Sequence, residues 1–377
     1  MDELSWIEIS KNKLLSNVRA LRQTIGSKIL LAPCIKANAY GHGMVLVSKI
    51  IKPYIDCFCV DSIKEAQILQ ENNIQKPILI IGYVLKKDLP YIYQLENISL
   101  TVYNNETLNE LYCLSKKYNQ PAKIHLKIDT GMGRQGILPQ EALTLAKKIS
   151  QTKCLKLEGM ATHFATADEL KNPAYFLAQL NLFKKIKQQL ETKLKQKIIF
   201  HAANSAAALC YGDAHFDLVR PGIALYGYYP SPEVKTLCQK KNLELEPVLS
   251  LKTKIAQIKE VSQGSCVSYN CTHITQRKTR LTVLPIGYFD GLPRKLSGKA
   301  RVLISGQRAK ILGRMCMNIT VVDITDIADV KVEDEAVIIG QQKNQQITAD
   351  ELAIHAETIN YEILTNLKGS LPRYVIN

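Results

Sequence analysis

A regular alternation of short apolar runs with helix-like segments, up to about residue 230, is the strongest constraint on the fold. The apolar runs that resemble buried strands are Leu30–Ile35, Cys57–Val60, Ile78–Ile81, Ser99–Val102, Lys123–Ile128, Leu157–Thr162, Ile198–His201 and Phe216–Val219. Helical periodicity is clearest at Asn105–Tyr118, Gln140–Gln151 and Phe176–Leu194. Alternating strands and helices predict an α/β protein with a parallel sheet. Eight such units favour a (β/α)8 TIM barrel, with a doubly wound open sheet as the alternative.

The pattern changes after about residue 235, where strand-like runs are separated by short turns. These runs are Val248–Ile258, Arg280–Pro285, Lys299–Ile304, Ala309–Leu312, Ile319–Ile324 and Glu335–Ile339. They predict a mostly β C-terminal domain. The segment Tyr229–Pro232 contains two prolines and a serine, which suits a domain boundary. We therefore expect a barrel at 10–232 and a β domain at 233–377, with a strand in 1–9 joining the second domain.

The net charge of the chain is +15. A basic balance is compatible with nucleic-acid binding, but the lysines are spread along the whole chain, which favours a solvated surface. The N-terminus lacks the basic and apolar segments of a signal peptide. No apolar run approaches the roughly 20 residues that cross a bilayer. We expect a cytoplasmic protein whose partners include neither nucleic acid nor membrane.

The ten cysteines are dispersed, and no C-x-x-C pair occurs. In a long chain without secretory features, scattered cysteines indicate reduced and mostly buried thiols. No clustered Cys/His spacing suggests a metal site, so none is expected.

Reactive side chains follow several predicted strands, where barrel enzymes place their catalytic groups. These residues are Lys36, Arg134, His163, Ser205 and Arg220. A lysine amine at a partly desolvated barrel mouth favours its neutral, nucleophilic form, which can bind pyridoxal phosphate as a Schiff base. A strand-end lysine that only extends its amine to solvent is the alternative.

Motifs along nearly the whole chain resemble the alanine racemase family in order and spacing. They occupy residues 35–43, 125–134, 158–168, 204–205, 219–223, 267–269, 285–291, 313–317 and 358–362. The first contains Lys36-Ala-Asn-Ala-Tyr40-Gly-His-Gly, which resembles the family's cofactor-attachment segment. The resemblance implies a barrel followed by a β domain, and interconversion of L- and D-alanine on a pyridoxal 5'-phosphate aldimine.

The resemblance implies two catalytic bases. Lys36 would hold the cofactor and then move a proton at the substrate Cα, while Tyr269 would act from the opposite face. His163 would lie beside Tyr269, with Arg220 behind it. The family places Arg220 against the pyridine nitrogen, and an arginine only donates hydrogen bonds. That nitrogen would therefore stay largely unprotonated and weaken the electron sink, which would limit side reactions.

The remaining site residues are also carried over from the family. The phosphate is expected at Asn204, Ser205, Gly222 and Ile223, where a helix start exposes N–H groups, and at the hydroxyls of Tyr40 and Tyr361. Arg134 and the backbone N–H of Met317 would meet the substrate carboxylate. Lys127 aligns with a lysine that is carbamylated in some members, and it would then orient Arg134.

The resemblance also implies an entry corridor and an assembly. Tyr288, Arg294, Arg314 and Asp168 resemble the corridor residues. Two positions depart from the family: Asn318 stands where aspartate is common, and Asn270 where glycine is frequent. A head-to-tail homodimer is implied, in which Tyr269 and Met317 reach the partner's site. The implied role is the supply of D-alanine for cell-wall peptidoglycan.

Three alternatives compete with this hypothesis. A pyridoxal-phosphate decarboxylase or a broader racemase would keep Lys36, and small pockets discriminate poorly between alanine and serine. A non-catalytic cofactor carrier would not need a second domain carrying Tyr269 and Met317. A nucleic-acid-binding protein would cluster its basic residues on one face.

Overall fold

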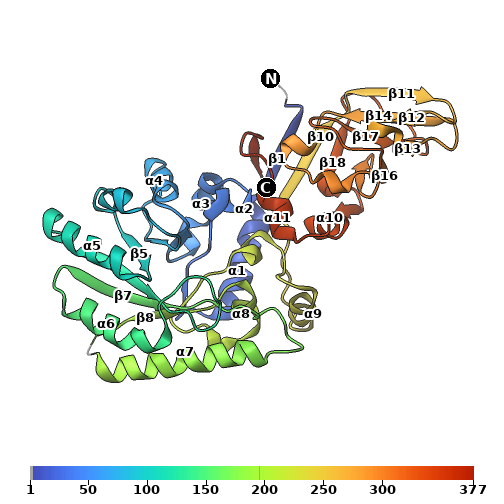
Figure 1. Cartoon of the computed structure of the whole chain (residues 1–377). Coiled ribbons are helices and arrows are strands. Elements are labelled where there is room, and N and C mark those ends of the chain that lie inside the picture. Colours follow the sequence, from blue (N-terminus) through green and yellow to red (C-terminus); the bar gives the residue numbers. More distant parts are fainter. Residues whose placement is uncertain (1–2, 195) are drawn as a thin grey trace. The chain divides into compact units, whose positions relative to one another are not determined.

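The computed structural model describes residues 3–194 and 196–377; residues 1 and 2 of the expected N-terminal segment 1–9 lie outside this range. Its contacts divide the chain into two compact units (Figure 1). The barrel unit comprises Leu14–Ala39 and Met44–Glu246, and the β unit comprises Met1–Lys13, Tyr40–Gly43 and Pro247–Asn377.

Eight parallel strands form the sheet of the barrel unit. They are β2 (Leu30–Leu31), β3 (Phe58–Val60), β4 (Ile78–Ile80), β5 (Ile98–Val102), β6 (Ala122–Lys127), β7 (Leu155–Ala161), β8 (Ile199–His201) and β9 (Leu218–Val219). Neighbours along the chain pair from β3 to β9, and β9 pairs with β2. A parallel bridge between Cys34 and Cys59 closes the ring, with the Ile35 N–H donating to the Cys59 carbonyl at 3.0 Å. The predicted (β/α)8 barrel is confirmed, and the open-sheet alternative is excluded.

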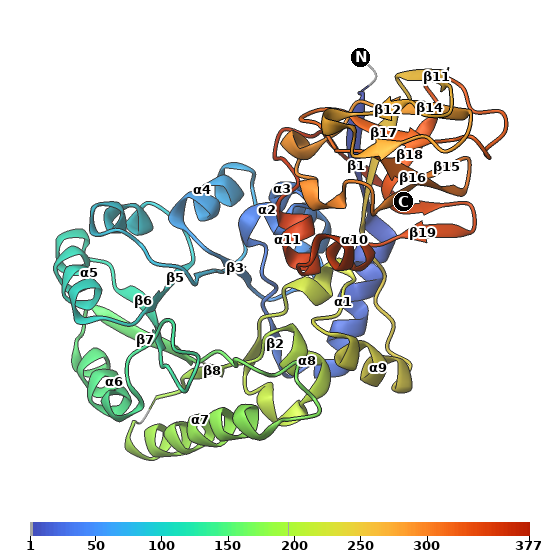
Figure 2. The same cartoon turned by 45° about the vertical axis from the view of Figure 1, so that its right-hand side comes forward.

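Helices cover the outside of this barrel, as the ring in Figure 2 shows. The barrel unit holds α3 (Met44–Ile51), α4 (Ile63–Glu71), α5 (Asn105–Tyr118), α6 (Ala142–Gln151), α7 (Ala174–Lys193), α8 (Ser205–Cys210) and α9 (Pro232–Lys240), with most of α1 (Lys11–Ile25). On α7 the buried residues Phe176, Leu180, Phe183, Ile186 and Leu190 recur at helical spacing and form one apolar face. Among the described residues, no helix is long and apolar enough to cross a membrane.

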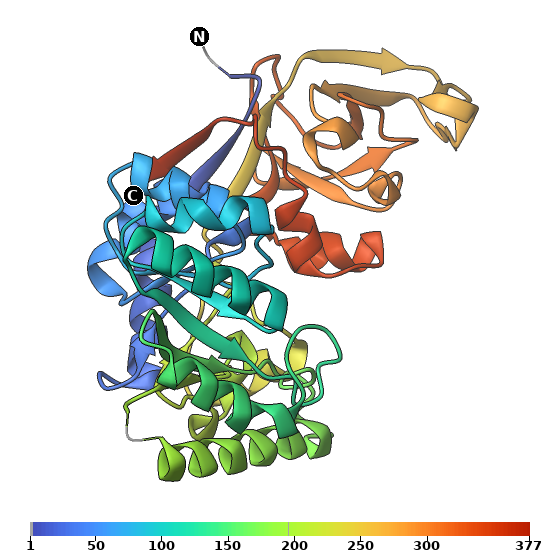
Figure 3. The ribbon, with the colours of Figure 1, turned by 60° about the vertical axis from the view of Figure 1, so that its left-hand side comes forward.

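The β unit is built around a sheet that contains the N-terminal strand. The strands of this sheet are β1 (Ser5–Ser10), β10 (Leu249–Lys254), β11 (Gln257–Val261), β14 (Thr279–Leu284), β15 (Arg301–Ile304), β16 (Gln307–Leu312), β17 (Thr320–Asp323), β18 (Glu335–Gln342), β19 (Gln345–Ile347) and β20 (Arg373–Ile376). A separate hairpin pairs β12 (Cys266–Val267) with β13 (His273–Ile274). The dark-blue β1 lies between β10 and β20 in Figure 3, antiparallel to the first and parallel to the second. Two helices follow β19, α10 (Ala349–Ala356) and α11 (Asn360–Thr365).

The run expected as one strand at Val248–Ile258 is two strands, and that prediction is wrong. The chain changes partners at Ile255 and Ala256, whose N–H groups donate to the carbonyls of Asp334 and Val283. Before this point β10 pairs with β18, and after it β11 pairs with β14. The alternating pattern of the run does not reveal such a change, because it continues across Ile255 and Ala256 although β10 buries every second residue and β11 buries none.

The contacts place the boundary of the two units between Glu246 and Pro247, whereas the proline-containing segment Tyr229–Pro232 predicts a boundary after Pro232. The buried Asn17 of α1 explains why the later residues remain with the barrel. Its side-chain amide donates to the carbonyls of Leu225 and Glu246, and its oxygen accepts from the Glu246 N–H at 2.8 Å. These hydrogen bonds hold the segment after α9 against the barrel unit.

Two cysteines of the β unit form a disulfide, between Cys266 and Cys271. The expectation that all cysteines are reduced is therefore wrong for this pair. The short β12–β13 hairpin brings the two residues together across a tight loop that also carries Tyr269. Of the other cysteines only Cys34, Cys59 and Cys238 are buried, so the expectation of mostly buried thiols is also wrong.

We predict that the purified protein, unfolded without reductant, exposes eight thiols to a thiol reagent, since eight of the ten cysteines are unpaired. After reduction the count should rise to ten. Replacement of both Cys266 and Cys271 by serine should leave eight thiols under either condition. Ten thiols in the unreduced wild type would contradict the pairing.

Candidate active site

Lys36 lies at the mouth of the barrel, where the chain leaves β2. Its Nζ is 2.9 Å from Oδ1 of Asp61, which follows β3 on the neighbouring strand. The side chains of Lys36 and Asp61 are 36% and 53% exposed, so both groups remain open to solvent. The amine is accordingly reachable by a ligand that enters the mouth.

The backbone after Lys36 makes a left-handed turn, labelled α2 (Lys36–Tyr40). Ala37, Asn38, Ala39 and Tyr40 have φ angles of 52°, 54°, 55° and 51°. Each such residue costs roughly 1–2 kcal/mol, so a run of four needs compensating contacts. The side chain of Asn38 provides one, accepting from the Met44 N–H at 2.9 Å. The turn ends the strand abruptly and leaves Lys36 at its end.

Arg220, which directly follows β9, is buried, and one side of its guanidinium is hydrogen-bonded within the barrel unit. Its guanidinium donates to Nδ1 of His201, to the Thr162 carbonyl at 2.9 Å and to the Ala202 carbonyl at 3.3 Å. An arginine has five N–H donors, so these three bonds hold its plane and leave donors for a further acceptor. Burial lowers the pKa of Arg220, but an arginine remains charged in proteins.

A chain of hydrogen bonds runs from Arg220 into the barrel. Nε2 of His201 lies 2.7 Å from Nδ1 of His125, and Nε2 of His125 lies 3.5 Å from Glu158. Because Arg220 can only donate, Nδ1 of His201 must accept, and the proton of a neutral His201 is on Nε2. The same argument puts the His125 proton on Nε2, toward Glu158. Each proton that links two members of this chain therefore points from Arg220 toward Glu158.

The pKa values of His201, His125 and Glu158 are consistent with these proton positions. Burial, followed by the charge of Arg220, holds the pKa of His201 well below its ordinary value. Burial also lowers the pKa of His125, although Glu158 opposes this. At Glu158 burial raises the pKa, but hydrogen bonds from His125 and Ser99 outweigh it, and the pKa falls to about 2. The chain thus joins a cation to an anion through two neutral imidazoles.

Gly159 makes room for this chain inside the sheet. It is the register partner of His125 on β7, and a Cβ there would lie 2.3 Å from Nδ1 of His125. Any side chain at this position would displace the imidazole. The glycine is therefore required by the packing of the histidine.

Ser205 begins α8, and Asn204 caps that helix by accepting from the Ala207 N–H at 3.0 Å. The Ser205 hydroxyl accepts from the N–H groups of Gly222 at 2.9 Å and Ala224 at 3.3 Å. With both lone pairs used, this buried hydroxyl can only donate its own hydrogen. Ile223 opens the 3-10 helix η5 (Ile223–Tyr226), and the N–H of this first residue lacks a partner inside the helix. These donors suit an anionic ligand.

Basic groups gather near the ends of β6 and β7. Burial, followed by the charges of Arg220 and Arg134, holds the pKa of Lys127 well below its ordinary value. Burial, followed by the charge of Lys127, has the same effect on the pKa of His163. Neutral forms of Lys127 and His163 are favoured, because further positive charge is costly there.

The loop that carries Arg134 is organised by one carboxylate. Oδ1 of Asp129 accepts from the N–H groups of Gly131, Met132 and Gly133, and Oδ2 accepts from the Arg134 N–H at 3.1 Å. Burial raises the pKa of Asp129, but these backbone bonds outweigh it and lower the pKa overall. The loop is held while the Arg134 side chain remains exposed.

The β unit brings together a second set of the sequence-predicted residues. Ser268 donates to the Arg314 carbonyl beside Tyr269, and the N–H groups of Tyr288 and Phe289 donate to the carbonyls of Cys316 and Met317. Tyr269 is 66% exposed and Met317 is 54% exposed. The rings of Tyr40 and Tyr361, also in this unit, lie 6.0 Å apart.

Of the two positions that depart from the family pattern, the structure explains Asn270 but not Asn318. Asn270 has φ +61°, a left-handed conformation that asparagine and glycine both adopt readily. Its replacement of the family's frequent glycine is thus explained by the backbone. Asn318 is exposed beside Met317, and nothing in the structure explains its substitution for aspartate. Of the corridor residues, Asp168 belongs to the barrel unit and Tyr288, Arg294 and Arg314 to the β unit.

Two other features do not form part of this site. Across the described residues, no group of three or more His, Cys, Asp or Glu could hold a metal ion.

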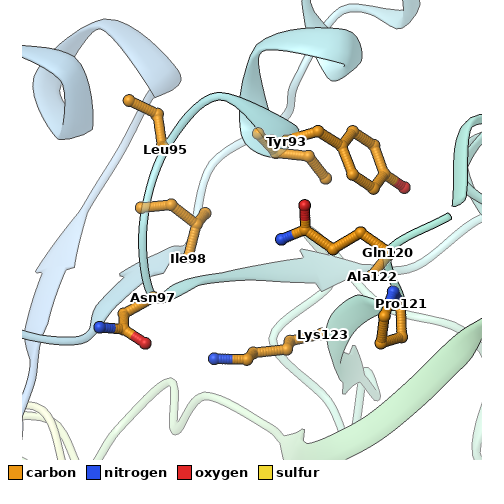
Figure 4. Close-up of a pocket in the computed structure, with 9 residues that line it drawn as sticks. Tyr93, Leu95, Asn97, Ile98, Gln120, Pro121, Ala122 and Lys123 are labelled. Carbon is orange, nitrogen blue, oxygen red and sulfur yellow. The ribbon is translucent and has the colours of Figure 1, made fainter. Parts of the chain in front are cut away.

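A solvent-open depression of about 310 Å³ is lined by residues such as Asn97, Gln120 and Lys123 (Figure 4). It lies beside the N-terminal ends of β5 and β6, opposite the strand ends that carry Lys127 and Arg220.

Comparison with known proteins identifies the family. The model described as alanine racemase, N-terminal domain, matches residues 9–230, and that described as alanine racemase, C-terminal domain, matches residues 248–375. The chain belongs to the alanine racemase family. An alanine racemase of Halothermothrix orenii is 40% identical over 98% of this chain and 96% of its own length. Alanine racemases are pyridoxal-phosphate-dependent isomerases, and the family membership supports racemisation of alanine.

Solved structures of alanine racemases are similar to this chain over its whole length. Alanine racemase of Clostridium difficile 630 has a TM-score of 0.93 and 35% identity, covering 100% of this chain and 96% of its own. The enzyme from Bacillus anthracis with bound L-Ala-P has a TM-score of 0.91 and 35% identity, with the same coverage. The family resemblance found in the sequence is thereby confirmed.

Sequence reasoning missed several residues that support the alanine racemase site. His125, His201 and Glu158 were not singled out for the hydrogen-bond chain, nor Gln179 of α7, whose amide donates to the His163 carbonyl at 3.1 Å. A signal was available, because polar residues at inward positions of apolar strands need buried partners. Which partners they meet depends on the register of neighbouring strands.

We predict that Glu158→Gln removes an acid-dependent part of the stability. The pKa of Glu158 is about 2 in the folded chain and 4.5 ordinarily, so its stabilisation is present above pH 4.5 and is lost as the pH falls toward 2. The contribution is roughly 3 kcal/mol at most. Urea unfolding between pH 7 and pH 3 should show a shallower acid decline for this variant than for wild type.

Glu71→Gln is the matched control, because Glu71 is an exposed carboxylate at the end of α4. That variant should follow the wild-type decline. Parallel loss of stability in wild type and Glu158→Gln below pH 4.5 would contradict the assigned role of the carboxylate.

Proposed function

We propose that this chain is an alanine racemase that binds pyridoxal 5'-phosphate on Lys36 and uses Lys36 and Tyr269 as its two bases. The observation that carries the proposal is the barrel mouth, where an accessible lysine, a fixed arginine and a donor-only serine occupy neighbouring strand ends. Family membership supplies the reaction class.

The donor set of the barrel unit fits this cofactor. Ser205 can only donate, and the N–H of Ile223, which opens η5, is a further donor for a phosphate. Tyr40 and Tyr361 would add their hydroxyls, while Asn204 and Gly222 would support the same site. Arg220 has donors left for the pyridine nitrogen, which would then accept and remain unprotonated. When bound, pyridoxal phosphate withdraws electrons from the substrate Cα and acidifies its hydrogen.

The Cα proton would be removed from one face of the substrate and replaced from the opposite face. Lys36 Nζ would take or return the Cα proton on one side, and the Tyr269 hydroxyl would do so on the other. His163 would be the neighbour of Tyr269, and its depressed pKa supports a neutral imidazole there. A tyrosine that opposes a lysine allows either enantiomer to lose its proton and receive another from the opposite side.

Arg134 and the Met317 N–H would hold the substrate carboxylate, with Lys127 as a support. The depressed pKa of Lys127 favours a neutral amine, which is the form that adds carbon dioxide. The addition forms an N–C bond and releases one proton, leaving a negative carbamate. This anion would lie between the charges of Arg134 and Arg220 and would orient Arg134.

A homodimer with shared sites completes the proposal. It is supported by exposed apolar side chains of the β unit, among them those of Tyr269, Tyr288, Phe289, Met317 and Ile319. Exposed apolar groups of this kind often mark a protein interface. Tyr269 and Met317 of one subunit would enter the site of the other. The proposal keeps the expected cytoplasmic location and the family-implied supply of D-alanine for peptidoglycan.

We predict that the purified protein with pyridoxal phosphate converts L-alanine in heavy water to D-alanine that carries deuterium at Cα. Solvent deuterium enters because the proton removed is not the proton returned. Chiral chromatography with mass detection measures both quantities. Bound cofactor without D-alanine would contradict the substrate, and the same assay with serine would then test a broader racemase.

Two variants belong to this experiment. Lys36→Ala should lose the absorbance of lysine-bound cofactor, while Tyr269→Phe should keep it and lose about 10²–10⁴-fold in proton exchange on one enantiomer. Mixing the two inactive variants should restore activity if sites are shared, since a hybrid dimer carries one complete site. Equal subunit exchange would restore about a quarter of the wild-type sites. No restoration, with hybrids confirmed, would contradict sharing.

We predict that Lys127 carries a carbamate. Labelling with ¹³C-bicarbonate at neutral pH should produce a carbamate carbon resonance in wild type that is absent from Lys127→Met. Lys123→Met, on the same strand, is the matched control and should retain the resonance. A wild-type spectrum without the resonance would show that Lys127 stays unmodified.

A further inference from the structure

The ion pair of Lys36 with Asp61 has no role in the proposed function as stated above. Its two members come from adjacent strands in equivalent register. Cys34 and Cys59 form the bridge that closes the barrel, and Lys36 and Asp61 each lie two residues beyond it. Parallel strands in register place such residues side by side on one face. The closure of the barrel therefore determines that these two side chains meet.

A second carboxylate holds the backbone on both sides of the pair. Oε1 of Glu65 accepts from the Ala37 N–H at 2.8 Å, and Oε2 accepts from the Asp61 N–H at 2.6 Å. Ala37 directly follows Lys36, so one side chain links the backbone of the lysine segment to that of its partner. Glu65 itself is held at the first turn of α4, where its N–H donates to the cap residue Ser62.

Gly82, after β4, provides the space for Asp61. A Cβ at this glycine would lie 2.2 Å from the Asp61 carbonyl oxygen and 3.0 Å from Oδ2. The first distance is to backbone, which cannot move away easily. The position of Asp61 is thus set by the strands on both sides of it.

Stability does not explain this arrangement, because an ion pair as exposed as this one contributes little to folding. We infer that Asp61 is a positioning residue for Lys36: its carboxylate receives the amine, by hydrogen bond and opposite charge, whenever Nζ is not bonded to cofactor. This inference rests on the proposed function. In one proton transfer Lys36 Nζ gains the Cα proton and becomes an ammonium, and the carboxylate stabilises that product by charge and hydrogen bonding.

The inference has opposite consequences for two steps. Attachment of the cofactor needs the neutral amine as nucleophile, so Asp61 should slow it. Proton abstraction by Lys36 forms the ammonium, so Asp61 should accelerate it. A residue that merely supported the local fold would change both steps in the same direction.

The test compares wild type with Asp61→Asn in both steps. In the apo-protein at saturating pyridoxal phosphate, the rate of attachment is followed by visible absorbance, and borohydride trapping with peptide mapping locates it on Lys36. We expect the variant to attach the cofactor about fivefold faster, the size expected for loss of a partly exposed ion pair. In the holoenzyme, loss of deuterium from Cα-deuterated alanine is measured separately for each enantiomer. We expect about fivefold slower loss from the enantiomer that Lys36 deprotonates and little change for the other.

Controls separate charge from position. Glu71→Gln removes an equal charge from the exposed end of α4 and should match wild type in both measurements. Asp61→Glu should restore part of the lysine-side exchange. Slower attachment together with equal slowing for both enantiomers, or no change in either step, would overturn the inference. If the wild type attaches cofactor to Lys36 but exchanges no deuterium, the proposed function fails, and the attachment rates alone still decide the role of Asp61.

Discussion

The hydrogen bonds that close the parallel sheet between Cys34 and Cys59 are the constraint on which the site depends. Without closure, β2 and β3 would be opposite edges of an open sheet, and Lys36 would have no strand beside it that carries Asp61. Closure also gathers the carboxyl ends of all eight strands around one mouth. Lys127, His163, Ser205 and Arg220 come from different strands and are brought near Lys36 for this reason.

The second organising feature is the direction of the buried hydrogen bonds below the mouth. An arginine donates and never accepts, so the orientation of Arg220 determines the proton positions of His201 and His125 in turn. Glu158 ends the chain as a carboxylate with a pKa of about 2. Each buried polar group is therefore satisfied in one arrangement only, which holds the Arg220 guanidinium rigid and keeps both imidazoles neutral.

Part of the site could be predicted from sequence because its residues directly follow recognisable strands. Lys36 and Arg220 follow apolar runs, and Ser205 follows a capping asparagine, so position and residue type suggested chemistry before any geometry was known. His125 and His201 lie inside strands, where an apolar environment suggests ordinary burial. Asp61 was not recognised because its significance depends on a neighbour from another strand. The Cys266–Cys271 pair was missed because a cysteine pattern does not specify pairing.

By itself the sequence determined the order of strands and helices, the barrel class, the change to a β unit and the family. These properties follow from local periodicity and from motifs in which each residue is read in its own segment. Only the tertiary structure decided the closure of the ring, the partner change between β10 and β11, the proton positions of His201 and His125, and the pairing of Lys36 with Asp61. The physical reason is that each of these depends on strand register, and register is set by hydrogen bonds between segments far apart in the chain.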